Sequence, residues 1–118
     1  MYCFILIIYI GGNVFSFGLG NYGVLGHGDD LTWQIPRQIM SLNSHRVKQI
    51  ALGKWHTLCL TYQGKLFTWG RNHRGQLGRG FVSDMELNPG LAVEINTDHE
   101  QTLRISAGML HSVAIIRV

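Results

Sequence analysis

Two histidines occupy matching positions in the chain and are the first candidates for chemistry. The sequence places His56 in the segment GKWHT and His111 in the segment GMLHS. An imidazole ring can serve as a general acid or base near neutral pH. A catalytic histidine has no reason to recur in successive segments, whereas a structural one does, and neither has an assignable nucleophile. We therefore expect both rings to be buried, with ring nitrogens bonded to main chain, and predict no catalytic residue and no enzyme.

A glycine-rich run at residues 18–23 has the spacing of a nucleotide-binding loop. Its sequence is GLGNYG, which matches Gly-x-Gly-x-x-Gly, and it follows a strand-like segment. That fingerprint binds a pyrophosphate because a helix N-terminus faces the phosphates. Here the following residues, VLGHGDD, form a poor helix, and an equivalent run has Asn72 where Gly20 stands. We interpret the run as a turn and predict no cofactor.

The two cysteines, Cys3 and Cys59, lie in apolar, strand-like segments without Cys-x-x-Cys spacing. His56 and Cys59 are three residues apart, a spacing that occurs among metal ligands. Residues three apart on a strand face opposite sides, so these two could not share one ion. We predict buried free thiols and no metal site.

Three arginines on a second glycine-rich run, Arg71, Arg74 and Arg79, are candidate contacts to a partner. Residues 37–79 hold eight Lys/Arg and no Asp/Glu, whereas residues 81–103 hold five Asp/Glu and no Lys/Arg. Such separation is typical of surfaces that bind phosphate or acidic protein, and solvated loops with chance clustering give the same pattern. Base stacking needs exposed aromatics, and the nearby aromatics are interpreted as core. A protein partner is therefore favoured over direct contact with nucleic acid.

The elements that must position these residues form an internal repeat. Residues 64–80 read GKLFTWGRNHRGQLGRG, and residues 12–28, which lie 52 positions earlier, read GNVFSFGLGNYGVLGHG. A second internal similarity relates residues 50–60, IALGKWHTLCL, to residues 105–115, ISAGMLHSVAI, at an offset of 55. Agreement at this many positions, five of them glycines in the first pair, indicates a repeat with a variable loop after Gly80.

Alternating residue types predict strands in both copies. Phe15 and Phe67 are expected on one face of their strands, and Ser16 and Thr68 on the other, with aromatic side chains filling the space between packed sheets. No segment of the sequence has helical periodicity, so the predicted class is all-β.

The apolar run at residues 4–10 has three possible readings. It is too short to span a membrane and lacks the basic start of a signal peptide. At the offset of 52, residues 6–12 overlay residues 58–64, which favours a strand before a hairpin. Pro36 and Pro89 are expected to open short edge strands, where a missing N–H is harmless.

These residues resemble the repeat of the regulator of chromosome condensation family. That repeat has an aromatic–Gly–x–Asn–x–x–Gly–Gln–Leu–Gly–x–Gly run, which residues 69–80 fit throughout, and a Gly–x–x–His–Ser/Thr element. The earlier copy departs from it at Gly20 and Val24. The positions that carry the motif are Gly18, Gly23, Leu25, Gly26, Gly28, Gly53, His56, Trp69, Gly70, Asn72, Gly75, Gln76, Leu77, Gly78, Gly80, Gly108 and His111.

The resemblance implies a partial β-propeller built from four-stranded blades. The 118 residues would form a single fragment of the propeller, with repeat units at about residues 1–11 (incomplete), 12–63 and 64–118. A whole disc of this family has about seven blades, so a little over two are expected here. Asn72 and Gln76 are expected to hold the glycine-rich turn through bonds to backbone.

The resemblance also implies function. Members of the family are exchange factors for the small GTPase Ran, chromatin-binding modules, or propellers appended to ubiquitin ligases and kinases. We therefore expect a non-catalytic interaction platform in the cytoplasm or nucleus, whose partner is a small GTPase, a chromatin protein or the missing blades. The plant ultraviolet-B receptor has tryptophan one place earlier than Trp55 in a similar element, so light sensing is not carried over.

Overall fold

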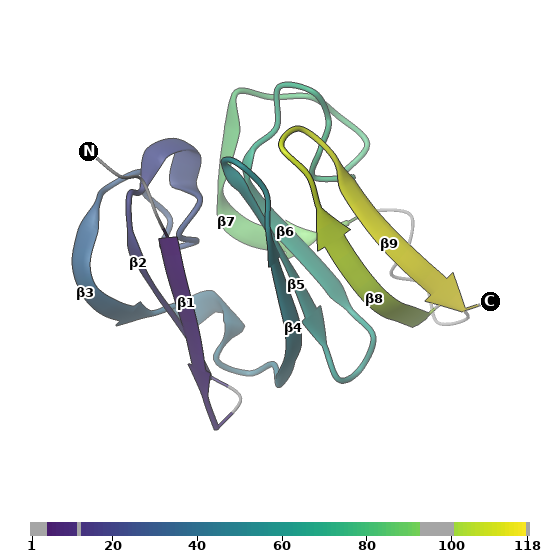
Figure 1. Ribbon diagram of the computed structural model, residues 1–118, viewed down its shortest axis with the longest axis horizontal. Helices are drawn as coiled ribbons and strands as arrows, with labels where there is room; N and C mark the ends of the chain where they lie inside the picture. Colours follow the sequence, from purple (N-terminus) through teal and green to yellow (C-terminus); the bar gives the residue numbers. More distant parts are fainter. Residues whose placement is uncertain (1–4, 12, 93–100, 118) are drawn as a thin grey trace.

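The computed structural model describes residues 5–11, 13–92 and 101–117, and over these residues the fold is all-β (Figure 1). The strands there form three antiparallel sheets that stand side by side. The first sheet contains β1 (Ile5–Ile10), β2 (Asn13–Gly18) and β3 (Trp33–Gln38). The second contains β4 (Val47–Leu52), β5 (His56–Thr61), β6 (Leu66–Arg71) and β7 (Met85–Leu91). The third contains β8 (Gln101–Ala107) and β9 (Ser112–Arg117).

The three sheets correspond to successive blades of the predicted propeller. The order β4-β5-β6-β7 gives one complete four-stranded blade, in which each strand pairs with the next along the chain. Strands β1, β2 and β3 repeat β5, β6 and β7, while β8 and β9 repeat β4 and β5. Two short 3-10 helices, η1 (Asn21–Gly23) and η2 (Met40–Leu42), lie between strands.

The strand at the start of the chain is confirmed, but its alignment slips by one residue. Ile5 opposes Gly18 in the first sheet, whereas His56 opposes Gly70 in the second. The offset is therefore 52 for β2 against β6 and 51 for β1 against β5. The slip arises in the turn: four residues separate Tyr9 from Val14, whereas five separate the equivalent pair, Leu60 and Leu66.

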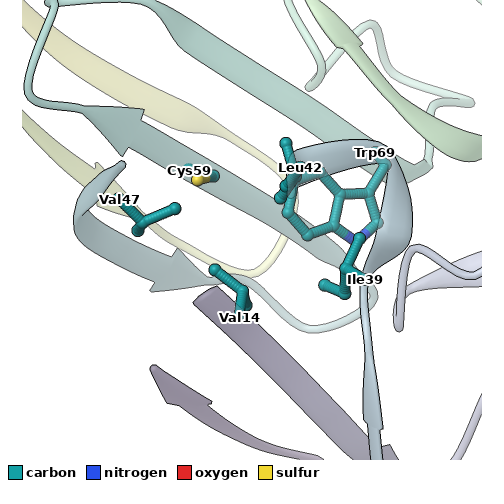
Figure 2. Close-up of a cluster of buried hydrophobic side chains, with 6 residues drawn as sticks. All are labelled: Val14, Ile39, Leu42, Val47, Cys59 and Trp69. Carbon is teal, nitrogen blue, oxygen red and sulfur yellow. The ribbon is translucent and has the colours of Figure 1, made fainter. Parts of the chain in front are cut away.

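Trp69 lies in the hydrophobic core between the first and second sheets (Figure 2). The buried residues of this core are Val14, Ile39, Leu42, Val47, Cys59 and Trp69, with Phe67 packed against them. A second core, between the second and third sheets, contains Leu58, Leu60, Leu66, Ala92 and Ile105. Strand β5 thus buries Cys59 on one face and Leu58 and Leu60 on the other, as expected for the middle of a stack.

The aromatic positions of the first sheet do not reach this core. Val14 and Ser16 of β2 are buried, whereas Phe15 and Phe17 are only half-buried. Phe67 and Trp69, their equivalents in β6, pack toward the first sheet. Phe15 and Phe17 therefore lie on the face of the first sheet that points away from the second.

The two prolines lie on edge strands as predicted, but they do not open them. Strands β3 and β7 begin at Trp33 and Met85, before Pro36 and Pro89. The ladder between β2 and β3 skips from Trp33 to Arg37, and the ladder between β6 and β7 shifts register before Gly90. Each proline falls in the irregular part of its ladder, where its missing N–H leaves no partner unsatisfied.

Two of the repeated glycines show why the turns need this residue. Gly70 has φ 106° and Gly78 has φ 64°, values that strain any residue with a side chain. At Gly70 an added Cβ would also lie 2.5 Å from the carbonyl oxygen of Trp55 and 2.8 Å from Cα of His56. At Gly78 its nearest neighbour would be Cβ of Ala92, at 3.8 Å.

We predict that valine at either Gly70 or Gly78 lowers the free energy of unfolding by more than about 1 kcal/mol. The loss should be larger for Gly70→Val, because main chain blocks the side chain there in addition to the backbone strain. Urea unfolding of the two variants beside the parent chain measures both values. Equal stability of all three chains would show that neither position is strained.

The isolated chain is expected to self-associate. Val113 and Ile115 of β9 are 49% and 55% exposed, and Phe15 and Phe17 lie on the outward face at the other end of the stack. Uncovered sheet faces and open strand edges drive association. Sedimentation velocity at micromolar concentration measures it. A monomer that melts cooperatively and binds no apolar dye would contradict this prediction.

Candidate partner-binding edge

The Gly-x-x-His segments form tight turns in which the glycine makes room for the ring. The amide of Gly53 donates to the carbonyl of His56 (2.8 Å), and the amide of Gly108 donates to that of His111 (3.0 Å). A Cβ on either glycine would overlap the imidazole three residues later. This close approach explains the spacing of the motif, which sequence reasoning recognised without giving its cause.

His56 joins the second sheet to the third. Its side chain is fully buried, and its Nε2–H donates to the carbonyl of His111 across 3.1 Å. Nδ1 is buried without a partner among the described residues, so the ring is held as the neutral tautomer. Burial lowers the pKa of His56 below its ordinary value, and the bond to the His111 carbonyl partly offsets this.

The expectation of burial is confirmed for His56 and wrong for His111, which is exposed. The turn that contains His111 covers His56, whereas no described element covers His111 in the same way. The structure describes no group of three or more histidine, cysteine or acidic residues that could bind a metal ion. Cys59 is a buried free thiol, whose pKa burial raises to about 12; Cys3 lies outside the described residues.

We predict that stability decreases as the pH falls below the ordinary histidine value of 6.5. The unfolded chain binds a proton there, while buried His56 does not, so protonation favours unfolding until the pH passes the lowered pKa. A His56→Gln variant keeps an N–H donor for the His111 carbonyl and removes the titrating ring. Its unfolding free energy should change less between about pH 7 and pH 5.

The matched control is His111→Gln, at the equivalent exposed position. Its unfolding free energy, measured by urea at each pH, should still decrease toward low pH and by more than that of His56→Gln, because the buried His56 ring and its acceptor carbonyl are both retained. An unchanged pH dependence in His56→Gln would contradict the role assigned to this ring.

Four hydroxyl groups tie the glycine-rich loops to the strands. Within the first and the second blade, a hydroxyl of the strand donates to the carbonyl of a leucine in the loop that follows it. Between blades, a hydroxyl of β5 or β9 donates to the loop of the preceding blade, at the carbonyl of the residue just before that leucine. The bonds are Ser16 to Leu25 (2.7 Å), Thr68 to Leu77 (2.8 Å), Thr57 to Val24 (2.9 Å) and Ser112 to Gln76 (2.6 Å). Serine in one copy of the repeat and threonine in the other therefore supply the same hydroxyl donor.

Asn72 holds the second glycine-rich loop, as its type predicts. It is fully buried; its amide group donates to Phe81 O (3.0 Å) and Ser83 Oγ (3.1 Å), and its Oδ1 accepts from the amide of Leu77. Gln76 accepts from the Arg74 amide at 2.9 Å. In the first copy a Cβ at Gly20 would overlap the main chain of Leu31, so asparagine would not fit there.

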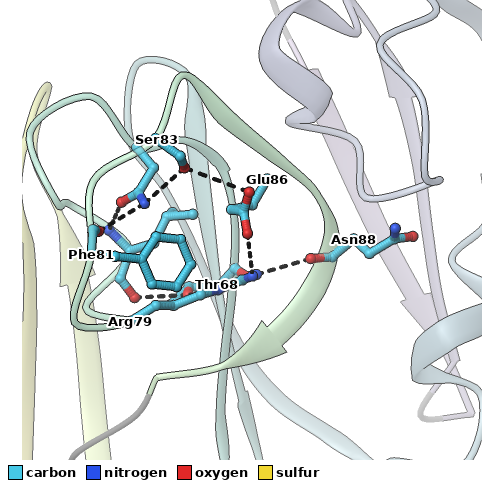
Figure 3. A network of polar contacts seen from close by, with 8 residues as sticks. Thr68, Arg79, Phe81, Ser83, Glu86 and Asn88 are labelled. Carbon is cyan, nitrogen blue, oxygen red and sulfur yellow. Dashed lines mark hydrogen bonds and ion pairs between the residues drawn. The ribbon is translucent and has the colours of Figure 1, made fainter.

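Arg79 belongs to a polar network inside its own blade (Figure 3). Its guanidinium donates to the carbonyls of Thr68 and Asn88 and forms an ion pair with Glu86 at 3.3 Å. Only 12% of the side chain is exposed, and burial lowers its pKa, with Glu86 acting in the opposite direction. Arg79 therefore has little capacity left for a partner, in contrast to Arg71 and Arg74, which form no ion pair in the described part of the chain.

Arg71 lies in a cluster of aromatic and cationic side chains at one end of the sheets. Its guanidinium carbon is 4.6 Å from the ring centroid of Tyr22, and the Tyr22 ring lies 5.9 Å from that of Trp55. The Arg71 amide also donates to the carbonyl of Trp55 (2.8 Å). Tyr22 has φ 62°, which is uncommon for a residue other than glycine. Three loops from two blades thus meet at this cluster.

We call this surface the loop edge and define it by Tyr22, Lys54, Trp55, Arg71 and Arg74. Lys54 and Arg74 are exposed, and the other three are partly exposed. Neither ion pair in the described part of the chain involves a residue of the loop edge. Sequence reasoning interpreted the aromatic residues near the arginines as core, whereas Tyr22 and Trp55 are partly exposed beside Arg71. Neither was selected from the sequence as a partner-binding residue.

The sequence profile described as the regulator of chromosome condensation (RCC1) repeat matches residues 11–60 and 63–115, and a second profile of that description matches residues 47–76. The chain belongs to the RCC1 repeat family. The fold is a segment of the RCC1 β-propeller, as its repeats predicted. No helix in the described residues has the length and apolar character needed to span a bilayer.

Relatives and solved structures agree with this assignment. The chain is 36% identical to the human E3 ubiquitin-protein ligase HERC2 over 103 residues, which are 87% of the chain and 2% of HERC2. It is 40% identical to the mouse RCC1 domain-containing protein 1 over 116 residues, covering 94% of the chain and 31% of that protein. The structure of Saccharomyces cerevisiae Prp20p, which is described with its binding to Gsp1p and histones, matches with TM-score 0.80 and 19% identity over 93% of the chain and 28% of Prp20p. The chain thus spans under a third of each.

Proposed function

We propose that this RCC1-type segment is a non-catalytic protein-interaction platform, and that its loop edge binds an acidic surface of a protein partner. The observation that carries the proposal is the stacking of Arg71 on Tyr22, beside Trp55, without an ion pair in the described residues. A guanidinium stacked on a ring is fixed in position while its N–H groups stay available to carboxylates.

The residue types at the loop edge favour a protein as the partner. Tyrosine, tryptophan and arginine are enriched among the side chains that dominate binding energy at protein interfaces. Lys54 and Arg74 are exposed and lie beside Trp55 and three residues after Arg71 in the chain, which adds positive charge to the loop edge. Complementary charge accelerates association and makes it sensitive to salt. Direct nucleic-acid binding has weaker support, because Tyr22 and Trp55 are engaged with Arg71 and with each other.

The family suggests which proteins are worth testing. A Ran-like small GTPase, a chromatin protein and further propeller blades are the proposed partner classes, in the nucleus or the cytoplasm. The alternative function is part of a guanine-nucleotide exchange factor, supported by the fold shared with Prp20p, which is described with its binding to Gsp1p and histones. The likeness to HERC2 supports instead a propeller appended to a ubiquitin ligase.

We predict that Arg71→Glu weakens binding of an acidic partner at least about tenfold, since it removes a hot-spot cation and adds a like charge. Biolayer interferometry would measure the chain against a Ran-type GTPase, core histones and a polyglutamate peptide, at low and at physiological salt. The GTPase and polyglutamate should bind more tightly at low salt. Nucleotide release from the GTPase, followed in parallel, should not accelerate; acceleration would favour the exchange-factor alternative.

Arg46→Glu provides the matched control. Arg46 lies over the ring of Tyr62 at 4.9 Å, a similar cation–aromatic pair at the opposite end of the blade. This variant should bind the probes within about twofold of the parent chain, because the same change in net charge is made away from the loop edge. Equal losses in both variants would attribute binding to net charge and contradict a specific site.

A further inference from the structure

His73 lies at the tip of a tight turn in the second glycine-rich loop. The amide of Gly75 donates to the carbonyl of Asn72 (3.1 Å), which closes a four-residue turn with His73 and Arg74 at its two central positions. Asn72 is fully buried and its side chain makes three hydrogen bonds, so the start of the turn is fixed. His73 itself is partly exposed and therefore stands on a rigid base at the surface.

Gln76 holds this turn from inside. Only 4% of the residue is exposed, and its main-chain carbonyl accepts from the Ser112 hydroxyl of the third sheet (2.6 Å). Its side-chain Oε1 accepts from the amide of Arg74 (2.9 Å). The NH2 group of the same carboxamide must then face the other way, and its nitrogen lies 3.5 Å from Nδ1 of His73.

This contact determines which ring nitrogen of His73 carries the proton. A carboxamide NH2 group can only donate, so Nδ1 accepts from it and the proton of the neutral ring is on Nε2. Partial desolvation, followed by the positive charges of Arg71 and Arg74, lowers the pKa of His73, so the ring is neutral at pH 7. No acceptor for Nε2–H occurs among the described residues, which leaves an oriented, neutral donor at the surface.

The surroundings of His73 favour a negatively charged acceptor. Arg71 and Arg74 are close enough for their charges to act on the ring, and neither forms an ion pair in the described part of the chain. The oxygens of a carboxylate have lone pairs for several N–H donors at once. This turn offers two kinds of donor to such a group, charged N–H groups from arginine and a neutral N–H group from histidine.

We propose that His73 is a further partner-binding residue beside the loop edge, and that Gln76 positions it. The ring Nε2–H donates to a carboxylate oxygen of the acidic protein partner that the cations of the loop edge attract. The first glycine-rich loop cannot position a ring in this way, because Asn21 and Val24 stand where the second has His73 and Gln76. This inference rests on the proposed function and adds a directional contact to a surface otherwise defined by charge and stacking.

The tautomer is tested without a partner, by proton–nitrogen NMR correlation of the histidine side chains in the complete 118-residue chain. Nδ1 of His73 should be unprotonated and Nε2 protonated at pH 7.5, with the signals assigned by their loss in His73→Gln. In Gln76→Glu a carboxylate oxygen replaces the NH2 group, so Nδ1 should gain a proton, while the Arg74 amide keeps its acceptor. An Nδ1 that stays unprotonated in this variant would contradict the positioning role.

Partner binding is measured with the polyglutamate peptide by biolayer interferometry at pH 7.5. His73→Leu should weaken binding about tenfold, or about 1.4 kcal/mol, which is close to the lower end of the range for a hydrogen bond to a charged group. His73→Gln keeps an N–H donor with a reach similar to that of Nε2, and it should bind within about threefold of the parent chain. Equal losses in the two variants would overturn the assignment of His73 as a donor.

His45→Leu is the matched control. It makes the same substitution at the opposite end of the blade, where the ring centroids of His45 and Phe67 are 4.6 Å apart, and it should leave polyglutamate binding within about twofold. Amide dispersion checks that each variant is folded. If the parent chain does not bind polyglutamate, the proposed function fails and this inference fails with it. If Arg71→Glu weakens binding and His73→Leu does not, only the inference is wrong.

Discussion

The structure depends on a buried main-chain carbonyl that accepts hydrogen bonds from two neighbouring strands. The carbonyl of Val24 receives the Thr57 hydroxyl and the Trp69 indole, and so joins the loop of one blade to two strands of the next. A polar group removed from water must find such partners, or the packing of sheet on sheet would lose free energy. The repeat therefore constrains side chains with donors, Ser/Thr and Trp, as strictly as it constrains apolar ones.

The glycine turns were predicted well from the sequence, because a backbone position with positive φ favours glycine at that position itself. Gly18, Gly26, Gly70 and Gly78 recur in register, and all four have positive φ. The Gly-x-x-His spacing was recognised as part of the repeat, without a physical cause. Gly53 is needed for contact with the imidazole of His56 rather than for a left-handed backbone, and contact between side chain and main chain has no periodic signature.

Burial was less predictable, because it depends on what lies beside a residue. His56 and His111 have the same local sequence pattern, yet only His56 is covered by a following turn. Tyr22 and Trp55 were not selected from the sequence as partner-binding residues, because they meet Arg71 only across a boundary between blades. Arg79 was grouped with Arg71 by charge and spacing, whereas three separate acceptors occupy its guanidinium.

In this fold, the contacts that stabilise the stack of blades differ from the side chains proposed to bind a partner. The second blade donates the Thr57 hydroxyl and the Trp69 indole N–H to the loop before it, and the third donates the Ser112 hydroxyl to the loop of the second. Such nearest-neighbour contacts add up along the stack. Arg71 and Lys54, at the blade ends, take no part in these hydrogen bonds, although Arg71 stacks on Tyr22 of the preceding blade. The side chains of the loop edge can therefore change without loss of the hydrogen bonds between blades, which leaves the loop edge free to differ in partner choice while the carbonyl contacts beneath it stay constant.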